Sequence, residues 1–258
     1  NEANPVRDWT HVYIPYCTGD IHWGHNRIVY GDGEPGAVEL HHRGAINGMA
    51  ALRWLTDNVV QPETVLATGC SAGSYGSIGW TPHLAKAYPE ARIVQFGDCG
   101  AGIITDTFLR DSFPSWQADW FMPAWIDSLD PEQVDIGSLN LADLYRRIGA
   151  FYPNVLLAQF NTVLDENQAF YFDAMGGTGG AEAWSDKMRA SIYDISQNTP
   201  SFKYFIADGE RHCIVPRNQF YSVETRGVLL LDWLSALLAG EAVDNVACEG
   251  CEPQPLEP

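Results

Sequence analysis

Short apolar segments alternate with helix-like segments along most of the chain. Each apolar segment is bounded by turn-forming residues, which is typical of strands buried on both faces of a parallel sheet. This pattern predicts five strands: His11–Tyr16, Thr64–Thr68, Arg92–Phe96, Val155–Phe160 and Lys203–Ala207. Apolar residues at helical spacing predict helices over residues 44–58, over residues 72–88, and from Leu230 to a stop at Gly240. The alternation predicts an α/β fold, a mostly parallel sheet flanked by helices.

Residues 105–150 break this alternation. They contain no good strand and are rich in aromatic residues: Phe108, Phe113, Trp116, Trp120, Phe121 and Trp125. We expect a mostly helical, cap-like insertion over one end of the sheet. Its aromatic side chains either line a pocket or form the insertion's own core, and both interpretations stay open. A length of 258 residues is typical of a single α/β domain, so we predict one domain over residues 1–258.

Charge and hydropathy exclude several classes of partner. The chain carries 33 acidic and 15 basic residues, a net charge of −18, which disfavours nucleic acid and anionic membranes. No apolar run approaches the ~20 residues needed to span a bilayer. The chain opens with the polar sequence NEANPVRDW, without an initiating methionine or a signal peptide. We therefore expect a processed or trimmed product.

The six cysteines indicate a possible disulfide framework. An even number is compatible with disulfides and with an oxidising compartment. Cys248 and Cys251 form a C-x-x-C pair in an acidic tail, with no second ligand pair nearby for zinc. We expect either a disulfide within the tail or a bridge from it to the body of the protein. Cys70 lies in a glycine-rich turn, where we expect a small, buried and unpaired residue.

The turn around Cys70 carries a motif for a nucleophile. Residues 69–73 read G-C-S-A-G, which matches G-x-S-x-G, and they lie between a predicted strand and a predicted helix. The glycines on either side are expected to relieve crowding in a sharp turn that presents Ser71. The backbone N–H of Ala72, at the N-terminus of the helix, would then face a developing oxyanion.

A serine nucleophile needs a base, and only two histidines follow Ser71 in the chain. His83 lies about three turns along the next helix, where it cannot reach back to its own serine. His212 lies just after the last predicted strand, where this fold delivers its base. We therefore predict that His212 is the general base.

The orienting acid should follow a strand that comes after Ser71. Asp165 lies in the loop after the strand at 155–160, and we predict that it is the acid. Its neighbour Glu166 is an alternative, and so is Asp98, which follows the strand at 92–96. Asp208 is a weaker candidate because it lies too close to the loop that carries His212.

These residues together resemble the pectin acetylesterase and Notum family of α/β-hydrolase carboxylesterases. The matching segments run in family order from residue 15 to residue 213: Pro15-Tyr16-Cys17-Thr18-Gly19-Asp20 with His22-Trp23-Gly24, Arg43-Gly44 with Asn47, Gly69–Gly73 with Tyr75-Gly76, Asp165-Glu166 with Gln168, and His212-Cys213. The resemblance implies the same triad, Ser71, Asp165 and His212, and an enzyme that needs no cofactor.

The resemblance also implies a function. Members of the family remove acyl groups held as carboxylic esters, and they are typically secreted and disulfide-bonded. We expect a serine carboxylic-ester hydrolase, secreted or periplasmic, that removes short acyl groups such as acetyl from a small-molecule or polysaccharide ester. Two alternatives stay open: an α/β-hydrolase peptidase with the same triad, and a non-catalytic binding module of hydrolase descent.

The sequence departs from the family pattern at its front. The family carries a Gly-Gly-Gly loop that supplies further oxyanion donors, and no such run precedes His11 or occurs elsewhere. One explanation is that the chain omits an upstream part of the protein with its N-terminal strands. Another is that a cleaved N-terminal segment stays bound as a separate chain. A third, less favoured, is that the loop Cys17–Trp23 supplies the second donor.

That loop also carries candidate pocket residues. Asp20, His22 and Trp23 lie at the carboxyl end of the first predicted strand, where sites form in such sheets. Together with His25 and the pair at 41–42 they resemble metal ligands, but their spacing matches no standard set. We expect no metal here. Instead, we expect Asp20 and His22 to brace the loop by hydrogen bonds and Trp23 to form a pocket wall.

Overall fold

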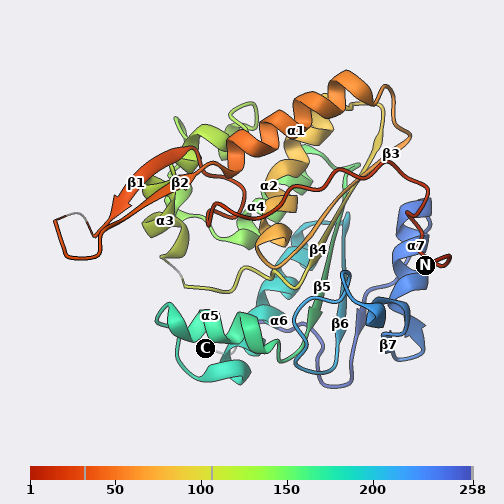
Figure 1. The fold of residues 1–258 in the computed structure, drawn as a ribbon. Coiled ribbons are helices and arrows are strands. Elements are labelled where there is room, and N and C mark those ends of the chain that lie inside the picture. The colour runs from red at the N-terminus through yellow and green to blue at the C-terminus, as the bar shows by residue number, and fades with distance from the viewer. Residues whose placement is uncertain (32, 106, 257–258) are drawn as a thin grey trace.

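A parallel sheet of five strands lies at the centre of the molecule (Figure 1). The computed structural model describes residues 1–31, 33–105 and 107–256. In order across the sheet, the strands are β3 (Thr64–Cys70), β4 (Arg92–Asp98), β5 (Leu156–Thr162), β6 (Phe202–Ala207) and β9 (Val246–Ala247). The α/β class is confirmed, as are four of the five predicted strands.

The predicted strand His11–Tyr16 is wrong. This segment has no strand partner among the described residues, and much of it is exposed, including Tyr13 at 86%. Its apolar residues line a cavity along the open edge of β3 instead of joining the sheet. Pro15 also lacks the N–H that a strand ladder needs. An apolar run therefore resembled a strand although the fold gives it no ladder to join.

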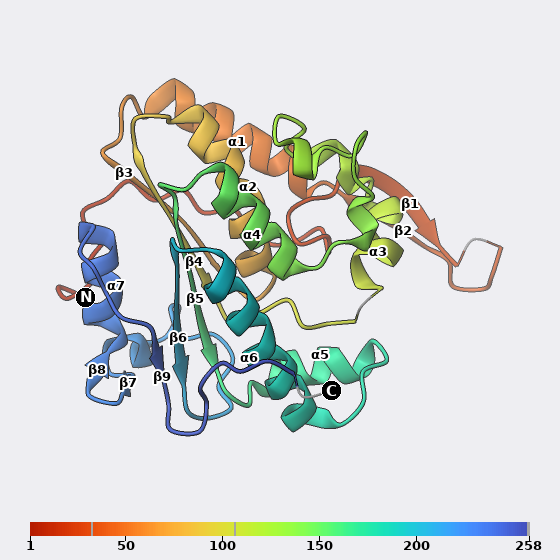
Figure 2. The ribbon, with the colours of Figure 1, turned by 180° about the vertical axis from the view of Figure 1, so that it is seen from behind.

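Helices cover both faces of the sheet (Figures 1 and 2). On one face lie α2 (Ala72–Ala87), α4 (Leu141–Phe151) and α6 (Gly180–Asn198), and on the other lies α7 (Leu230–Ala239). The helix α1 (Gly44–Asn58) packs beside α2, where Gly48 leaves room for the ring of Trp80. The helices predicted over 44–58 and 72–88 and the one ending at Gly240 are all present, and Gly240 has the left-handed backbone of a helix stop.

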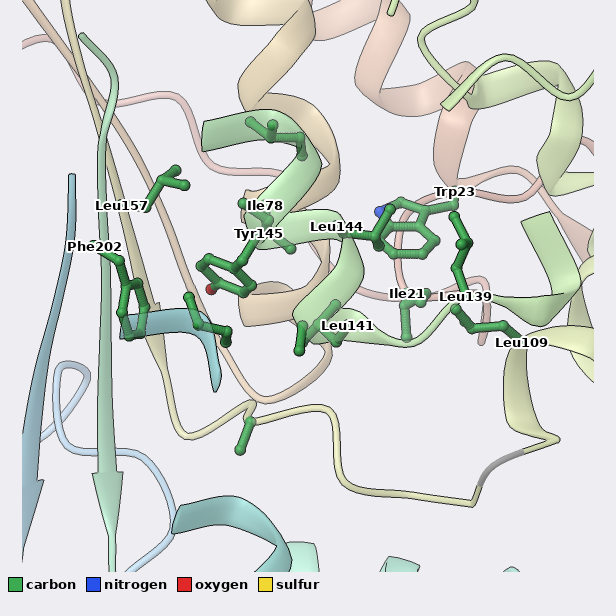
Figure 3. Packing of buried hydrophobic residues seen from close by; sticks show 14 of the residues in the cluster. Ile21, Trp23, Ile78, Leu109, Leu139, Leu141, Leu144, Tyr145, Leu157 and Phe202 are labelled. Atoms are coloured by element: carbon green, nitrogen blue, oxygen red, sulfur yellow. The ribbon is translucent and has the colours of Figure 1, made fainter. Parts of the chain in front are cut away.

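The strands bury alternate residues in two separate cores. Leu157 points toward α4 and packs near Tyr145 and Phe202, whereas its neighbour Ala158 faces the core under α7 (Figure 3). Tyr145 is fully buried, and its hydroxyl accepts a hydrogen bond from the side chain of Gln95 at 3.1 Å. The sheet is thus covered on both faces, as its near-continuous apolar strands require.

The aromatic insertion is helical, as predicted. It contains α3 (Phe108–Trp116) and three short 3₁₀ helices, Ala118–Phe121, Asp127–Leu129 and Ile136–Ser138, and it leads into α4. Phe113 and Phe121 are buried against Trp23 and form a core for the insertion. Phe108 and Trp116 also line the cavity beside β3, so both interpretations of the aromatic residues hold for different members.

Several elements were not anticipated. The antiparallel hairpin β1 (Asn26–Tyr30) and β2 (Val38–His42) projects from the body, and a smaller hairpin joins β7 (Glu224–Thr225) to β8 (Val228–Leu229). The remaining elements are α5 (Glu166–Ala174) and the 3₁₀ helix Asn218–Tyr221. After β9, Cys248 and Cys251 form a disulfide, which confirms the first of the two predictions for the tail.

Within the described ranges, no helix combines the length and the apolar character that a bilayer crossing requires.

The core under α4 should dominate stability. Leu157 is fully buried, so Leu157→Ala should lower the free energy of unfolding by about 2–5 kcal/mol in urea titrations. Val60, which is 80% exposed, provides a matched aliphatic control, and Val60→Ala should leave stability nearly unchanged. Equal losses for the two variants would contradict this assignment of the core.

Candidate active site

Ser71 occupies a strained turn between β3 and α2. Its backbone has φ 57° and ψ −119°, in the positive-φ region that side-chain-bearing residues rarely adopt. Such a conformation costs on the order of 1–3 kcal/mol and persists only where neighbouring structure enforces it. Here the N–H of Ser71 donates to the carbonyl of Asp98 at 2.8 Å, and the carbonyl of Ser71 accepts from Ser74 at 2.8 Å. The G-x-S-x-G motif therefore forms a tight strand-to-helix turn.

The two motif glycines have different roles. A Cβ at Gly69 would lie 2.5 Å from the carbonyl carbon and oxygen of Gly73, a distance that no packed structure tolerates. A Cβ at Gly73 would meet nothing within 4 Å. The expectation that both glycines relieve crowding is thus correct only for Gly69. Gly73 instead keeps open the cavity that it lines beside Ser71.

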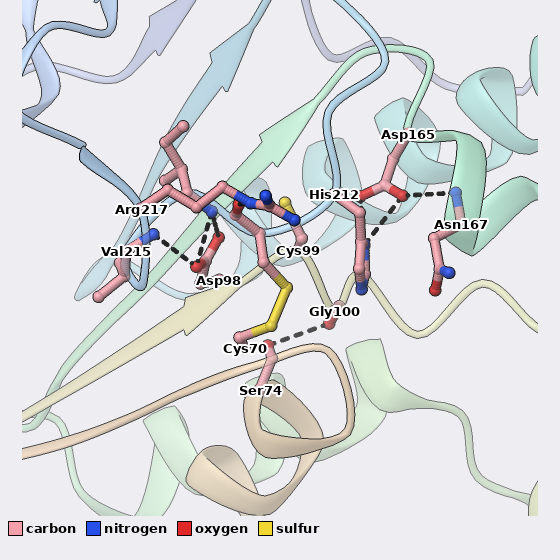
Figure 4. The surroundings of a disulfide bond; sticks show 12 residues. Cys70, Ser74, Asp98, Cys99, Gly100, Asp165, Asn167, His212, Val215 and Arg217 are labelled. Atoms are coloured by element: carbon pink, nitrogen blue, oxygen red, sulfur yellow. Dashed lines mark hydrogen bonds and ion pairs between the residues drawn. A yellow bond between two sulfur atoms is a disulfide. The ribbon is translucent and has the colours of Figure 1, made fainter. Parts of the chain in front are cut away.

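The structure brings His212 and Asp165 together. The Nδ1 atom of His212 lies 2.9 Å and 3.0 Å from the two carboxylate oxygens of Asp165, which is fully buried (Figure 4). Asp165 also caps α5 by accepting from the N–H groups of Asn167 and Gln168, and it accepts from Nε2 of Gln168 at 3.0 Å. These contacts hold the carboxylate in one orientation against the imidazole.

The alternative acids lie elsewhere. Glu166 and Asp208 are exposed, and Asp208 accepts from the N–H of Gly209. Asp98 accepts from backbone amides of the loop that follows His212 and makes no hydrogen bond to the imidazole. Among the residues that the structure describes, Asp165 is the one carboxylate bonded to His212.

His83, the other histidine after Ser71, belongs to the core. Its Nε2 lies 3.0 Å from the carbonyl of Phe121, and burial lowers the pKa of His83 to about 4. This placement agrees with its exclusion as the base.

A disulfide joins the turn at Ser71 to the loop that carries His212, so the prediction that Cys70 is unpaired is wrong. Cys70, immediately before Ser71, bonds to Cys213, immediately after His212, and their Cα atoms lie 5.6 Å apart (Figure 4). Two segments 143 residues apart in sequence are therefore held next to each other. The Ser71 hydroxyl makes no hydrogen bond to His212 within the described chain. Such bonds are often long without substrate and tighten in the substrate complex.

A cavity of about 1110 Å³ lies beside Ser71. It is bordered by α1, α2, the open edge of β3 and the N-terminal segment, and Ser71, Ala72 and Gly73 all line it. The N–H of Ala72, at the start of α2, has no hydrogen-bond partner among the described residues. It is therefore available to an oxyanion. Gly19 and His22 line the same cavity, and a second donor from their loop stays a prediction.

The three residues predicted to lie at the pocket, Asp20, His22 and Trp23, differ in their position relative to the cavity. Asp20 is fully buried and accepts from the N–H of Gly44 at 2.8 Å, from the N–H of His22 and from the hydroxyl of Thr18. It braces the loop, as expected, but does not line the cavity. His22 does line it, and burial lowers the pKa of the His22 imidazole.

Trp23 does not form a pocket wall. It is fully buried between the rings of Phe113 and Phe121, because a large apolar ring behind the loop is needed to anchor the insertion. Nor do the candidate metal ligands gather: His25 stacks on Trp120, and His42 bonds to the carbonyl of Thr18 and to the Tyr30 hydroxyl. Within the described ranges, the closely grouped potential ligands are instead Cys70, His212 and Cys213, two of them in a disulfide, and Cys99, Asp165 and His212, two of them in the proposed triad.

Sequence reasoning missed the connections that organise the site. Gln168 holds Asp165 and also accepts from the N–H of Ala101 at 2.9 Å, which links the acid to the segment after β4. The disulfide had a visible signal, because one cysteine adjoins the predicted nucleophile and another adjoins the predicted base. Once Ser71 and His212 are assigned to one site, Cys70 and Cys213 must be neighbours.

Comparison with known proteins identifies the relatives of this chain. Residues 1–112, which include the Ser71 turn, match the family model described as pectinacetylesterase. The resemblance predicted from the sequence is confirmed. Two crystal forms of the Wnt deacylase Notum from Drosophila match the fold with TM-scores of 0.61 and 0.62 at 15% identity. Each match covers 93% of this chain, and 70% and 73% of the respective Notum chains.

No curated protein sequence matches this chain. The pectinacetylesterase match indicates a carboxylic ester hydrolase, and the Notum structures show the same fold.

The difference between the two motif glycines can be tested directly. Gly69→Ala should lower the free energy of unfolding by roughly 1–3 kcal/mol, because the added methyl group meets the Gly73 carbonyl. Gly73→Ala should be neutral or stabilise by up to ~1 kcal/mol, because alanine is the better helix former and has room. Chemical denaturation measures both variants. A larger loss for Gly73→Ala would contradict the geometry of the turn.

Proposed function

We propose that the chain is a serine carboxylic-ester hydrolase that works through an acyl-enzyme. The observation that carries this proposal is the buried Asp165–His212 pair, tied by the Cys70–Cys213 disulfide to the turn that presents Ser71. The disulfide thus links the proposed base and its orienting acid to a strained serine that lines a cavity. This is the arrangement that serine acyl transfer requires.

The reaction follows from the roles of these groups. The Ser71 oxygen attacks the ester carbonyl while Nε2 of His212 takes the hydroxyl proton. Collapse of the tetrahedral intermediate expels the alcohol, which receives that proton from His212, and the acyl group stays on Ser71. Water then attacks the acyl-enzyme with His212 again as base and releases the carboxylic acid. Throughout, Asp165 holds the imidazole through Nδ1 and stabilises its charged form.

The oxyanion is assigned to the start of α2. The free N–H of Ala72 adjoins the nucleophile, and the helix dipole favours negative charge at this end. One such donor typically contributes roughly 10²–10³ to the rate. A second donor is therefore required for full activity, and the Gly19–His22 segment of the cavity wall is the candidate within this chain.

The proposed substrate is a short acyl ester, such as acetyl, of a carbohydrate or another alcohol. Support comes from the family match, whose description names pectin acetyl esters, and from the fold shared with a deacylase. We further propose that the enzyme acts outside the cytoplasm, secreted or periplasmic. Its two disulfides are typical of proteins in oxidising compartments.

Three variants test the catalytic assignment. A fluorophosphonate probe should label the wild type at Ser71 and leave Ser71→Ala unlabelled. Asp165→Asn should lower kcat for p-nitrophenyl acetate by roughly 10⁴-fold, because the imidazole loses the partner that fixes its tautomer. Asp208→Asn, which changes an exposed carboxylate near the same loop, should keep wild-type kcat. Absence of labelling in folded wild-type protein would refute the esterase and favour a binding module.

A substrate series tests the proposed class. Rates should be highest on p-nitrophenyl acetate and fall toward the palmitate ester, and acetylated polysaccharides should release acetate. Peptide substrates should remain intact. Cleavage of peptides, or a preference for long acyl chains, would contradict the proposed substrate.

A further inference from the structure

One buried carboxylate beside the site has no part in the reaction described above. Asp98, the last residue of β4, is fully buried, and no Lys, Arg or His forms an ion pair with it among the described residues. Burying a carboxylate without a counter-charge is costly unless hydrogen bonds compensate. The hydrogen-bond partners of the Asp98 carboxylate therefore indicate its role.

All of its backbone donors come from the base loop. One oxygen of Asp98 accepts from the N–H groups of Ile214 at 3.0 Å and Val215 at 2.9 Å, and the other lies 3.1 Å from the same Ile214 nitrogen (Figure 4). These residues follow His212 by two and three positions. The carboxylate thus fixes the chain immediately after the base.

The same residue also holds the nucleophile turn. The carbonyl of Asp98 accepts from the N–H of Ser71 at 2.8 Å, and Asp98 pairs in register with Cys70 across the sheet. Its main chain therefore contacts one reacting segment and its side chain the other. The disulfide between Cys70 and Cys213 joins these two segments a second time.

The base loop needs this support because its backbone is not relaxed. Cys213 has a positive φ of 59°, which costs energy for a residue with a side chain. On the other flank of His212, the carbonyl of Arg211 accepts from the Thr162 hydroxyl at 2.9 Å. Burial raises the pKa of Asp98, and the Ile214 and Val215 amides and the nearby Cys99 and His212 oppose that rise. The Ile214 and Val215 amides thus offset part of the cost of burying this carboxylate.

We propose that Asp98 is a positioning residue, whose carboxylate sets the location of His212 relative to Ser71 by holding the amides of Ile214 and Val215. The inference rests on the proposed function of Ser71 and His212, since it describes how the base is placed. The Asp98 carboxylate makes no hydrogen bond to the imidazole among the described residues and acts through the amides of the loop.

Kinetics of two variants test the effect on catalysis. Asp98→Ala removes both acceptors and should lower kcat about 10²-fold while KM stays nearly unchanged, because a base displaced by about 1 Å slows the chemical step and not substrate binding. Asp98→Asn keeps one oxygen as an acceptor, so it should show a smaller loss of about 3- to 10-fold. Wild-type kcat in folded Asp98→Ala would overturn the proposal. If Asp98→Ala does not fold, unchanged kcat in Asp98→Asn would do so.

Hydrogen exchange of backbone amides tests the loop without relying on activity. The amides of Ile214 and Val215 should exchange at least about 10-fold faster in Asp98→Ala than in the wild type. Asp20→Ala, which removes an equally buried carboxylate from another loop, serves as the control for global destabilisation and should not single out these two amides. Unchanged exchange at Ile214 and Val215 would overturn the proposal.

Kinetics and hydrogen exchange together distinguish a failure of the positioning role from a failure of the proposed esterase function. Faster exchange in Asp98→Ala together with a wild type that hydrolyses no ester would refute the esterase. It would also overturn the positioning of a catalytic base. An active wild type whose Asp98 variants keep full kcat would refute the positioning role and leave the esterase intact.

Discussion

The site depends on the parallel register of β3, β4 and β5. Because these strands run in one direction, their carboxyl ends meet at one edge of the sheet, and Cys70 lies opposite Asp98, which lies opposite Phe160. Ser71, the proposed nucleophile, follows the first of these residues, and Asp165, the proposed acid, lies after the third strand. Backbone hydrogen bonds between the strands therefore bring residues from distant parts of the chain to one edge of the sheet, independently of contacts between their side chains.

Register alone does not place His212, the proposed base, because the chain after β6 is a loop and not a strand. A covalent bond from Cys213 to Cys70 and two amide hydrogen bonds to Asp98 restrict the loop behind His212. In front of it, Thr162 holds the carbonyl of Arg211. The imidazole is thus fixed from both sides and needs only Asp165 to set its rotation. A loop held by a disulfide and several hydrogen bonds can fix the position of a side chain as well as a strand does.

The proposed order of the triad, Ser71, Asp165 and His212, rests on a strand order that the sequence predicted and the structure confirms. Short apolar runs marked β3 to β6 correctly, and with the strands known, the loops that carry Asp165 and His212 were determined. The segment 11–16 had the same apolar character but no ladder to join, and strand formation depends on a partner that composition does not reveal. The burial of Asp98 and Trp23 could not be predicted either. The residue type alone does not distinguish an aspartate that accepts hydrogen bonds from backbone amides from an aspartate in solvent. Nor does it distinguish a tryptophan in a pocket wall from one in a core.

Three of the acidic residues are buried near the site, which the net charge of the chain does not reveal. Asp20, Asp98 and Asp165 are each fully buried, and each accepts at least two backbone N–H groups from a loop or from the first turn of a helix. A carboxylate is suited to this work because two acceptor oxygens with a full charge bind amide donors more strongly than a neutral oxygen does. Loops and the first turns of helices leave such amides without helix or sheet partners, and burial without acceptors would be costly. By accepting these hydrogen bonds, the three aspartates hold the backbone around them in one conformation. Of these three, Asp165 is the one that makes a hydrogen bond to an imidazole in the described chain, and that bond separates a proposed member of the triad from two residues that share its burial and its chemistry.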